Sequence, residues 1–289
     1  MSLGFIGGSG LYKLEAELEN MKRVDVETPF GTPSDQFICG TLNNVDVIFL
    51  PRHGIGHKIL PGELNHRANI YGMKKLGATH LLSLSACGSL REEMKPRDLV
   101  IVDQYVDRTK RASEHTFFGN GIVAHIPFAD PVCPELFTLL YDVATSLVTK
   151  HAPETTVHQG GTYLNMEGPA FSTKAESNLY RSWGMDVIGM TNMAEAKLAR
   201  EAGICYATLA MVTDYDCWHE EHDSVTLEMI LGNLSANSGL AQKITEEITR
   251  KVVQLPRKCS CSSTLGTALV TDLSLVSEKV KNDLTIILP

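Results

Sequence analysis

The sequence predicts an α/β fold that forms a single domain over residues 1–289. Short apolar segments with strand character alternate with amphipathic helical segments along the whole chain, and neither an internal repeat nor an interdomain linker interrupts them. The longest apolar segment, 204–212, is rich in β-forming residues and contains no Gly or Pro. Such a run is typical of a strand buried on both faces by helices.

The composition excludes several classes of protein. The chain has 43% hydrophobic residues and a net charge of −8, which argues against a general nucleic-acid binder. Any anion site must therefore be built locally from a few donors. There is no basic and apolar leader and no run near 18 apolar residues, so we expect a soluble, non-secreted protein in the cytoplasm, with the nucleus as a second location.

The cysteines are odd in number and scattered, which suits reduced thiols. The close pair Cys259-Ser-Cys261 could oxidise or bind a metal, but we expect an inert surface loop there. The seven positions are Cys39, Cys87, Cys133, Cys205, Cys217, Cys259 and Cys261.

The amino-terminal segment begins with a short apolar strand over 3–6 and continues into Gly7-Gly8-Ser9-Gly10. Glycines let backbone N–H groups approach an anion closely, so this turn is typical of a phosphate site. The pattern is not G-x-G-x-x-G, because the third glycine position holds Lys13. A plain tight turn is an equally good interpretation of this stretch alone.

A hairpin is predicted from strands over 36–40 and 45–50 with Asn43-Asn44 between them. The second strand runs into Pro51-Arg52-His53-Gly54, where Arg52 offers a planar set of donors that fits phosphate oxygens. His53 and His57 could form a metal pair, but the intervening glycines argue against a helix that would align them.

The remaining elements follow from periodicity and capping signals. Thr173 and Glu176 form a capping box at the start of a helix, and Gly77 and Gly203 are helix stops. Residues 256–270 are predicted to be a flexible loop, followed by a helix over 273–281 and an apolar tail. The other predicted strands are 79–85, 98–102, 162–166, 186–191 and 204–212, and the other helices are 64–76, 134–147, 173–183, 193–202 and 226–253.

Two carboxylates, Asp214 and Asp216, follow the buried strand over 204–212. Ligands of open α/β sheets bind at the carboxyl ends of the strands, so this pair marks a candidate site. The sequence Ser85-Ala86-Cys87-Gly88-Ser89 ends another strand with small residues whose backbone can face a ligand. A strand-ending Asx turn explains the acids about equally well on composition alone.

Several motifs taken together closely resemble the trimeric purine nucleoside phosphorylase family, from Leu3 to about Val253 and again at 286–289. The resemblance implies a central mixed β-sheet flanked by helices and a tail that packs near the site. Ala170 and Gly189 depart from the family, where relatives often carry Arg and Asn. The motifs are Gly7-Gly8-Ser9-Gly10, Pro51-Arg52-His53-Gly54, 85–89, 167–172 and 210–218.

The resemblance also implies an activity: phosphorolysis of 5′-methylthioadenosine to adenine and 5-methylthioribose 1-phosphate, a pentosyl transfer in purine and methionine salvage. Phosphate would be a co-substrate, with no cofactor and no metal. Asp214 would donate a proton to the purine N7, which needs a raised pKa. Asp216 would accept from the 6-amino group. The counterparts of the family's phosphate ligands are Ser9, Arg52, His53, Ser85, Ala86 and Thr191.

The other site residues also rest on the resemblance. Met190 would pack under the ribose, Phe171 would flank the base, and Ser172 would lie between the two pockets. Leu227 and Ile230, three apart on one helical face, would meet the methylthio group. His125 and Ile287 of a neighbouring subunit would close that pocket, which implies a homotrimer.

Three alternatives stay open. A phosphorylase of 6-oxopurine nucleosides is disfavoured because Asp216 would face the 6-oxo group with an acceptor. A metallohydrolase could use His53, His57, His219 and His222, but the last two are three apart and do not form H-E-x-x-H. A non-catalytic nucleoside-binding protein would not need phosphate donors beside an acid.

Overall fold

Two long parallel strands form the centre of the sheet in the computed structural model, which describes residues 2–8, 17–219 and 227–289. They are β5 (Ala78–Ser89) and β11 (Cys205–Asp214), paired from Cys205 beside His80 to Asp214 beside Gly88. All of β11 is buried, as predicted for its apolar sequence. The strand pair therefore carries Asp214 to the same edge as the small residues that end β5.

The described residues form a mixed sheet of eleven strands in the order β2-β3-β4-β1-β5-β10-β9-β7, and β5 also pairs with β11, which leads through β6 to β8. The predicted hairpin is confirmed: β3 and β4 are antiparallel, and Asn43 and Asn44 turn with φ of 53° and 62°. The bounds are β1 Ser2–Gly7, β2 Glu19–Val24, β3 Phe37–Leu42, β4 Val45–Pro51, β6 Leu99–Val102, β7 Gln104–Asp107, β8 Val157–Gln159, β9 Thr162–Asn165 and β10 Val187–Gly189.

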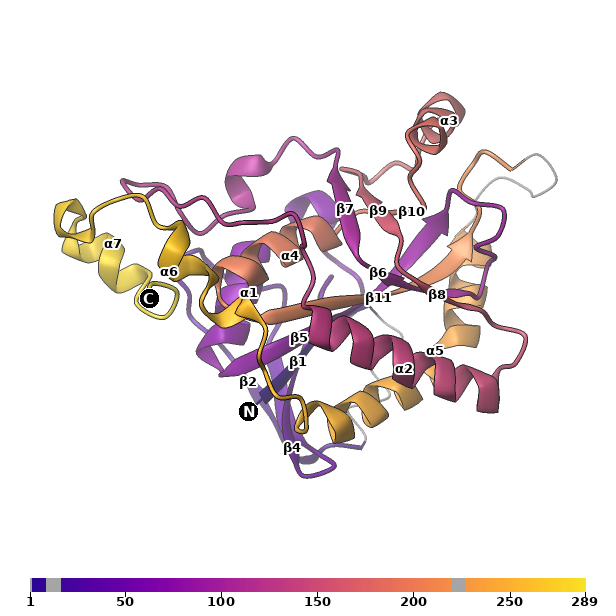
Figure 1. Cartoon of the computed structure of the whole chain (residues 1–289), viewed down its shortest axis with the longest axis horizontal. Coiled ribbons are helices and arrows are strands. Elements are labelled where there is room, and N and C mark those ends of the chain that lie inside the picture. The colour runs from indigo at the N-terminus through magenta and orange to yellow at the C-terminus, as the bar shows by residue number, and fades with distance from the viewer. Residues whose placement is uncertain (1, 9–16, 220–226) are drawn as a thin grey trace.

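Helices cover both faces of this sheet (Figure 1). On one face α2 (Pro134–His151) and α5 (Leu227–Val252) lie side by side over the core that contains Leu3 and Phe5. On the other, α1 (His66–Lys75) and α4 (Asn192–Glu201) pack over the core that contains Ile6. The alternation of Phe5 and Ile6 between two cores follows from the two-residue period of a strand.

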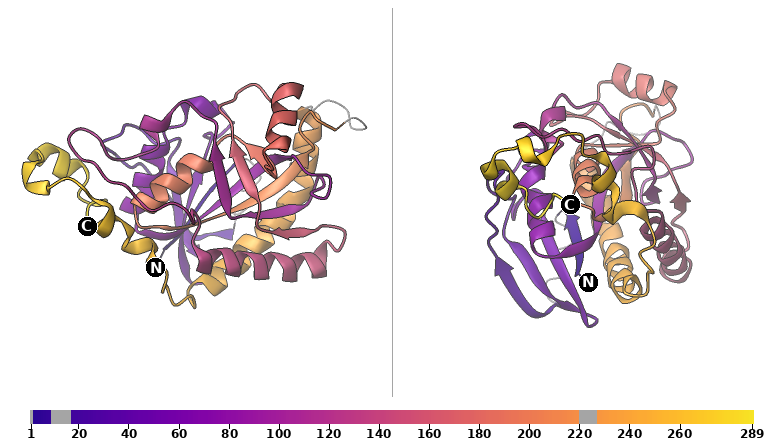
Figure 2. Two further views of the ribbon diagram at one scale, coloured as in Figure 1. Left: turned by 45° about the horizontal axis from the view of Figure 1, so that its top comes forward. Right: turned by 60° about the vertical axis from the view of Figure 1, so that its left-hand side comes forward.

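Local signals end and begin the helices as predicted. Gly77 and Gly203, with φ of 91° and 67°, follow α1 and α4. The capping box of Thr173 and Glu176 starts α3 (Lys174–Ser182), which stands at the rim of the sheet in both views of Figure 2. No helix in the described part of the chain combines the length and the apolar character that crossing a membrane requires.

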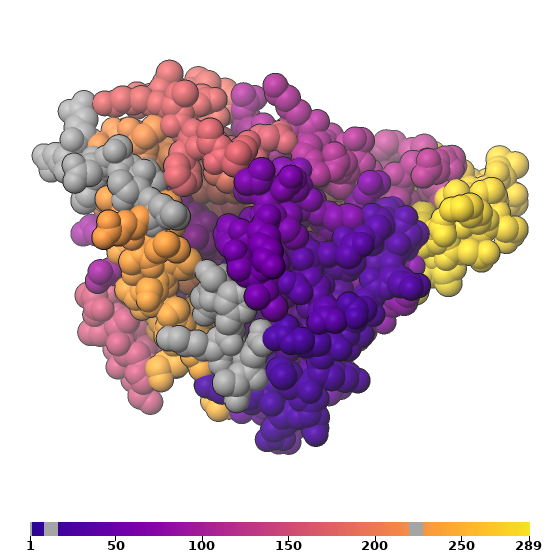
Figure 3. Space-filling view, turned by 180° about the vertical axis from the view of Figure 1, so that it is seen from behind, coloured from indigo at the N-terminus to yellow at the C-terminus, as the bar shows by residue number. Residues whose placement is uncertain are grey.

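The carboxyl-terminal segment forms one end of the molecule, seen in yellow in Figure 3. It contains α6 (Thr264–Ala268) and α7 (Glu278–Asp283), with 3-10 turns η4 (Ser260–Ser262) and η5 (Leu273–Leu275). Two further 3-10 turns in the part of the chain that the structure describes are η2 (Pro61–Glu63) and η3 (Ala112–Glu114). In place of the predicted loop over 256–270, η4 and α6 are ordered elements because Cys261, Leu265 and Ala268 are buried against the domain.

Candidate active site

A cavity of about 290 Å³ lies at the carboxyl ends of β4, β5 and β11. Strand register brings its wall together: Gly7 pairs with both Pro51 and Leu84, while Ala210 pairs with Ser85. The residues that follow these positions therefore converge from distant parts of the sequence. Arg52 and Asp214 both line this one cavity.

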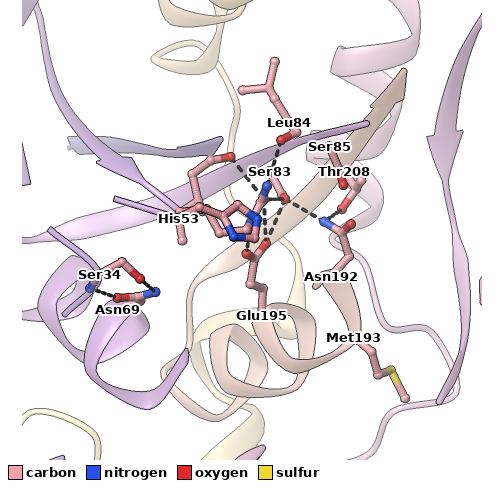
Figure 4. A network of polar contacts seen from close by, with 12 residues as sticks. Ser34, His53, Asn69, Ser83, Leu84, Ser85, Asn192, Met193, Glu195 and Thr208 are labelled. Atoms are coloured by element: carbon pink, nitrogen blue, oxygen red, sulfur yellow. Dashed lines mark hydrogen bonds and ion pairs between the residues drawn. The ribbon is translucent and has the colours of Figure 1, made fainter. Parts of the chain in front are cut away.

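Arg52 is held by an ion pair with Glu195 of α4. Figure 4 shows Glu195 beside Ser83 and Asn192 in this network of polar contacts. Its Nε donates to Glu195 Oε1 at 2.6 Å, and its Nη2 donates to Ser83 Oγ at 2.6 Å and to Glu195 Oε2 at 3.2 Å. Its Nη1 donates to the carbonyl of Leu84 at 3.1 Å. Because a guanidinium has five N–H groups, these bonds leave little more than one Nη1 hydrogen for a ligand. Arg52 acts here mainly as a fixed, buried positive charge.

Glu195 and its neighbours are site residues that the sequence analysis missed. Ser83 Oγ donates to Glu195 Oε2 at 2.8 Å, and Asn192 Nδ2 donates to Ser83 Oγ at 2.6 Å. The charge of Arg52 lowers the pKa of Glu195 although burial acts to raise it. An acid facing the sheet from an otherwise small and apolar helix, among Met193, Ala194 and Ala196, was the available signal.

His53 lies beside this pair with one ring nitrogen already bound. Its Nδ1 lies 2.8 Å from the carbonyl oxygen of Ile59, which can only accept, so Nδ1 carries the hydrogen. Burial, followed by the charge of Arg52, lowers the pKa of His53 to about 4. The imidazole is therefore neutral near pH 7 and its Nε2 is an acceptor. His57 also lines the cavity, and its ring stacks on His53 with centroids 4.4 Å apart.

Hydroxyls and a helix start complete this end of the cavity. Ser85 and Ala86 come from the end of β5, and Thr191 is the N-cap residue of α4. The Thr191 side chain makes no cap hydrogen bond, which leaves its hydroxyl for a ligand. The N-terminus of a helix favours negative charge, so this end has the chemistry of an anion site. The structure brings together Arg52, His53, Ser85, Ala86 and Thr191, while Ser9 lies outside the described residues.

Asp214 lines the same cavity and is 5% exposed. Burial raises the pKa of Asp214, and the nearby charge of Asp216 adds to that rise. The Thr213 hydroxyl lies 2.7 Å from Asp214 Oδ2 and 3.1 Å from the carbonyl oxygen of Cys87. The single hydroxyl hydrogen cannot be donated fully to both oxygens. If Asp214 is protonated, it can donate to the Thr213 hydroxyl while that hydroxyl donates to Cys87.

Asp216 offers a buried acceptor to the cavity. Its Oδ2 is inaccessible to solvent in the chain and has no hydrogen-bond partner among the residues that the structure describes. Burial raises the pKa of Asp216, against which the Ser177 and Ser172 hydroxyls act as weaker, lowering influences. A buried carboxylate oxygen without a partner is unfavourable, so the Asp216 carboxyl, which lines the cavity, has capacity to accept from a donor on a ligand.

Two glycines make room for these groups. A Cβ at Gly88 would lie 2.9 Å from Asp214 Oδ1 and 3.1 Å from Ile188 Cγ2, so the close approach of three strands requires glycine. A Cβ at Gly189 would lie 1.8 Å from Oη of Tyr163. The buried side chain of Tyr163 therefore occupies the space that a larger residue at position 189 would need.

Part of the cavity wall is apolar. Met190, Phe171 and Ile230 line it, together with Leu231 and Leu234 of α5. Leu227 is the first residue of α5, and its side chain is outside the described part of the structure. Phe171 is 50% exposed in the single chain, so half of its surface is free for a ligand or a neighbouring molecule.

Three predicted residues do not line the cavity. Ser172 lies just behind it, near Asp216, and its carbonyl accepts from Cys217 Sγ at 3.2 Å. His125 is exposed and its backbone N–H donates to Ala268 in the carboxyl-terminal segment, and Ile287 is buried in the core beneath α1 and α4. In the single chain the tail thus packs away from the cavity wall.

The histidines of the metallohydrolase alternative do not assemble. His53 and His57 stack on each other, whereas His219 Nε2 lies 3.0 Å from Glu92 Oε1. His222 lies outside the described residues. Within residues 2–8, 17–219 and 227–289, the one group of at least three metal-ligating side chains that meets consists of cysteines and lies elsewhere.

Known proteins share both this sequence and this fold. The profile of the Phosphorylase superfamily matches residues 2–250. S-methyl-5′-thioadenosine phosphorylases of Geobacter sulfurreducens and Thermosynechococcus vestitus are 53% and 57% identical over 286 residues, which span 99% of this chain and 97% of each relative.

The solved structures agree. A methylthioadenosine phosphorylase from an antarctic soil metagenomic library has a TM-score of 0.92 at 46% identity, covering 99% of this chain and 98% of the other. The Schistosoma mansoni methylthioadenosine phosphorylase in complex with adenine has a TM-score of 0.82 at 32% identity, covering 99% and 97%. The chain belongs to the phosphorylase superfamily and, within it, to the family of the S-methyl-5′-thioadenosine phosphorylases.

Proposed function

We propose that this cavity binds 5′-methylthioadenosine and inorganic phosphate and catalyses phosphorolysis to adenine and 5-methylthioribose 1-phosphate. One observation carries the proposal: a fixed cation with hydroxyl donors, and a buried acid with a raised pKa, line the same cavity. Apolar side chains, among them Met190, Phe171 and Ile230, line the same cavity and could contact a sugar and its 5′ substituent. Binding a nucleoside alone would need the acid but not the cation with its hydroxyl donors.

Phosphate would occupy the end beneath Arg52. Its oxygens would accept from Ser85, Thr191 and the remaining Nη1 hydrogen of Arg52, with Ser9, His53 and the backbone of Ala86 completing the shell. The N-terminus of α4 adds a favourable dipole. Glu195 keeps the guanidinium from swinging toward the anion, so the charge stays where it was placed before phosphate arrives.

Adenine would bind against the two acids. Asp216 Oδ2, which has no partner among the described residues, would accept from the 6-amino group. Asp214 would donate its proton to N7 as the C1′–N9 bond breaks, so that adenine leaves as a neutral base. A phosphate oxygen then bonds to C1′ of the cationic ribosyl group, and Asp214 regains a proton before the next cycle.

The methylthio group would lie on the apolar part of the wall. Met190 and Phe171 would contact the ribose and the base, and Ile230 and Leu227 of α5 would face the 5′ substituent. Ser172 would support the base pocket through its position near Asp216. An apolar pocket prefers methylthio over hydroxyl by roughly 1–3 kcal/mol, so adenosine would be a weaker substrate.

We further propose a homotrimer in which His125 and the segment around Ile287 approach a neighbouring chain's cavity. His125 and half of Phe171 are exposed in the single chain, which supports such a contact. The reaction would need no cofactor, because phosphate is a co-substrate. A cytoplasmic or nuclear location stays a prediction from the sequence.

The experiment is adenine release from 5′-methylthioadenosine by the purified full chain, with and without phosphate. The proposal predicts adenine and 5-methylthioribose 1-phosphate only when phosphate is present, and much weaker turnover of inosine. Phosphate-independent release would indicate a hydrolase, and a preference for inosine would favour the 6-oxopurine alternative. Either result contradicts the proposal.

A further inference from the structure

Four buried or half-buried cysteines meet at the end of β11 opposite to the acids. Their sulfur atoms all lie within 4.8 Å of one another, and the sulfurs of Cys205 and Cys259 are 3.5 Å apart. Three of the four are at most 2% exposed, and Cys259 is partly buried. The group consists of Cys133, Cys205, Cys259 and Cys261.

We propose a structural zinc site, separate from the catalytic cavity, whose ligands are the thiolates of Cys133, Cys205, Cys259 and Cys261. Zinc binds four thiolates tetrahedrally at about 2.3 Å, which places the sulfurs about 3.8 Å apart. The observed separations, 3.5 Å between Cys205 and Cys259 and at most 4.8 Å within the group, lie on both sides of that value, so only small shifts are needed to reach it. Bonded disulfide sulfurs, in contrast, are about 2.05 Å apart, much closer than the 3.5 Å between Cys205 and Cys259.

The ligands come from three segments that other contacts already hold together. Cys133 is the N-cap residue of α2, and its backbone N–H donates to the carbonyl of Tyr206 at 2.8 Å. Cys205 begins β11. Cys259 is the N-cap residue of the turn η4 and Cys261 lies within it, in the segment that follows α5.

Two further contacts fix the turn to the domain. The backbone N–H of Lys258 donates to Glu135 Oε1 at 2.8 Å, in the first turn of α2. Gly203, just before β11, faces the turn so closely that an added Cβ would lie 3.4 Å from the backbone of Ser262. The protein therefore arranges the four sulfurs before any ion binds, as expected of a built site.

A positive charge lies where the site needs it. A zinc ion with four thiolates carries a net charge of −2, which must be compensated when the site is buried. Arg257 lies two residues before Cys259, and its Nη2 donates to the carbonyl of Gly203, two residues before Cys205, at 3.2 Å. Its Nε is buried and has no hydrogen-bond partner among the described residues, so this cation has a donor left over close to the ligand segments.

The site would stabilise the fold and take no part in the chemistry. Four protein ligands leave no open position for a substrate. Cys205 and Asp214 are nine residues apart on β11, about 30 Å at about 3.3 Å per residue. Zinc would fasten η4, and with it α6 and the tail that holds Ile287, to the starts of α2 and β11. Thiolates select zinc over magnesium or calcium.

The test measures zinc in the full chain purified under reducing conditions without a metal-affinity tag. We expect about one zinc ion per chain by inductively coupled plasma mass spectrometry. C259S and the double variant C259S/C261S should lose it, whereas C39S, a matched control in β3, should keep it. The thermal midpoint should fall by several degrees in the zinc-free variants, while phosphorolysis at low temperature stays within about twofold.

A second measurement uses the wild-type chain, so its result does not depend on whether the cysteine variants fold. Cobalt added to chelator-treated wild-type chain should give the thiolate-to-cobalt charge-transfer bands of a tetrahedral site, and zinc should abolish them. No metal in the purified chain together with no cobalt bands would overturn the proposal. So would intact-mass loss of two or four hydrogens under the same reducing conditions, because it shows disulfides in place of thiolates.

Discussion

The backbone N–H of Asp216 donates to Asp214 Oδ1 at 2.8 Å, so the first acid fastens the turn that carries the second. Asp216 adopts a left-handed conformation, with φ of 51°, which directs its side chain back to the cavity. Asp214 has its oxygens bound within the protein, whereas Asp216 retains one without a partner among the described residues. Two neighbouring carboxyls thereby acquire different tasks.

Replacing Asp216 by Asn should relax the choice of purine. The amide can donate to a 6-oxo group, which a carboxylate cannot. We expect kcat/KM for 5′-methylthioadenosine to fall by about 10- to 100-fold and the inosine-to-methylthioadenosine ratio to rise by a similar factor. Steady-state kinetics with both nucleosides checks this. Asp142→Asn, on the exposed side of α2, serves as the control. An unchanged inosine-to-methylthioadenosine ratio in Asp216→Asn would contradict a contact between Asp216 and the 6-position of the purine.

The Arg52–Glu195 pair should contribute to both stability and phosphate binding. Both side chains are at most 3% exposed, so Glu195→Gln leaves a buried cation without its counter-charge. We expect a loss of about 3–5 kcal/mol in the free energy of unfolding and a higher KM for phosphate.

Glu247→Gln is the matched control, since Glu247 pairs with Arg250 and Lys251 on the surface. It should change stability by at most about 1 kcal/mol. Urea unfolding of both variants gives the comparison. If the free energy of unfolding falls by the same small amount in both variants, the ion pair with Glu195 does not stabilise the buried charge of Arg52.

Phosphate binding should depend on a proton at His53. The free imidazole is neutral, since its pKa is lowered to about 4, and its Nδ1 hydrogen is held by Ile59. Nε2 and an unprotonated phosphate oxygen are both acceptors, so a hydrogen bond between them requires one proton. That proton comes either with phosphate, bound as the monoanion, or from protonation of the imidazole ring. KM for phosphate should rise about tenfold per pH unit above neutrality. In His53→Gln the amide supplies its own donor, so KM should be higher but nearly independent of pH.

Glu201 should make the fold less stable at high pH. It is 5% exposed, and burial raises its pKa to about 7 although Phe117 N–H and the Thr116 hydroxyl donate to it. Between the unfolded pKa and 7 the folded state binds more protons than the unfolded state, so stability falls as pH rises through this window.

Glu201→Gln isolates this effect. The amide can still accept from Phe117 and donate to Thr116, but it carries no charge. The two proteins should be equally stable near about pH 4, and the variant should gain up to about 3 kcal/mol relative to wild type by about pH 8. Parallel thermal melts across pH measure the difference. A constant difference would show that Glu201 keeps an ordinary pKa.

Local signals in the sequence were sufficient for the longer elements and for the two acids, but not for the short strands β2, β7 and β8 or for η4 and α6. The capping box at Thr173, the stop at Gly203 and the Asn43-Asn44 turn each depend on neighbouring residues, and all are present. Pairings between distant strands could not be predicted in this way, because β5 and β11 are separated by more than a hundred residues. The convergence of Arg52 with Asp214 rested on resemblance until the register supplied it.

The Arg52–Glu195 ion pair and the group of four cysteines could not be predicted from the sequence, for the same reason. Glu195 is one acid in a helix until the fold places it against Arg52. Cys259 and Cys261 suggested a surface loop because their partners, Cys133 and Cys205, are remote in sequence. The segment predicted to be a loop is therefore a packed turn, and its packing depends on contacts with residues that are distant in sequence.

The most direct test of the central claim compares Asp214→Asn with wild type on two substrates. In 5′-methylthioadenosine the leaving base needs a proton at N7, whereas its 7-methyl derivative is already cationic there. We predict that Asp214→Asn lowers kcat/KM for the first by at least about 100-fold and for the second by less than about tenfold. Equal losses on both substrates would contradict the role of Asp214 as the acid.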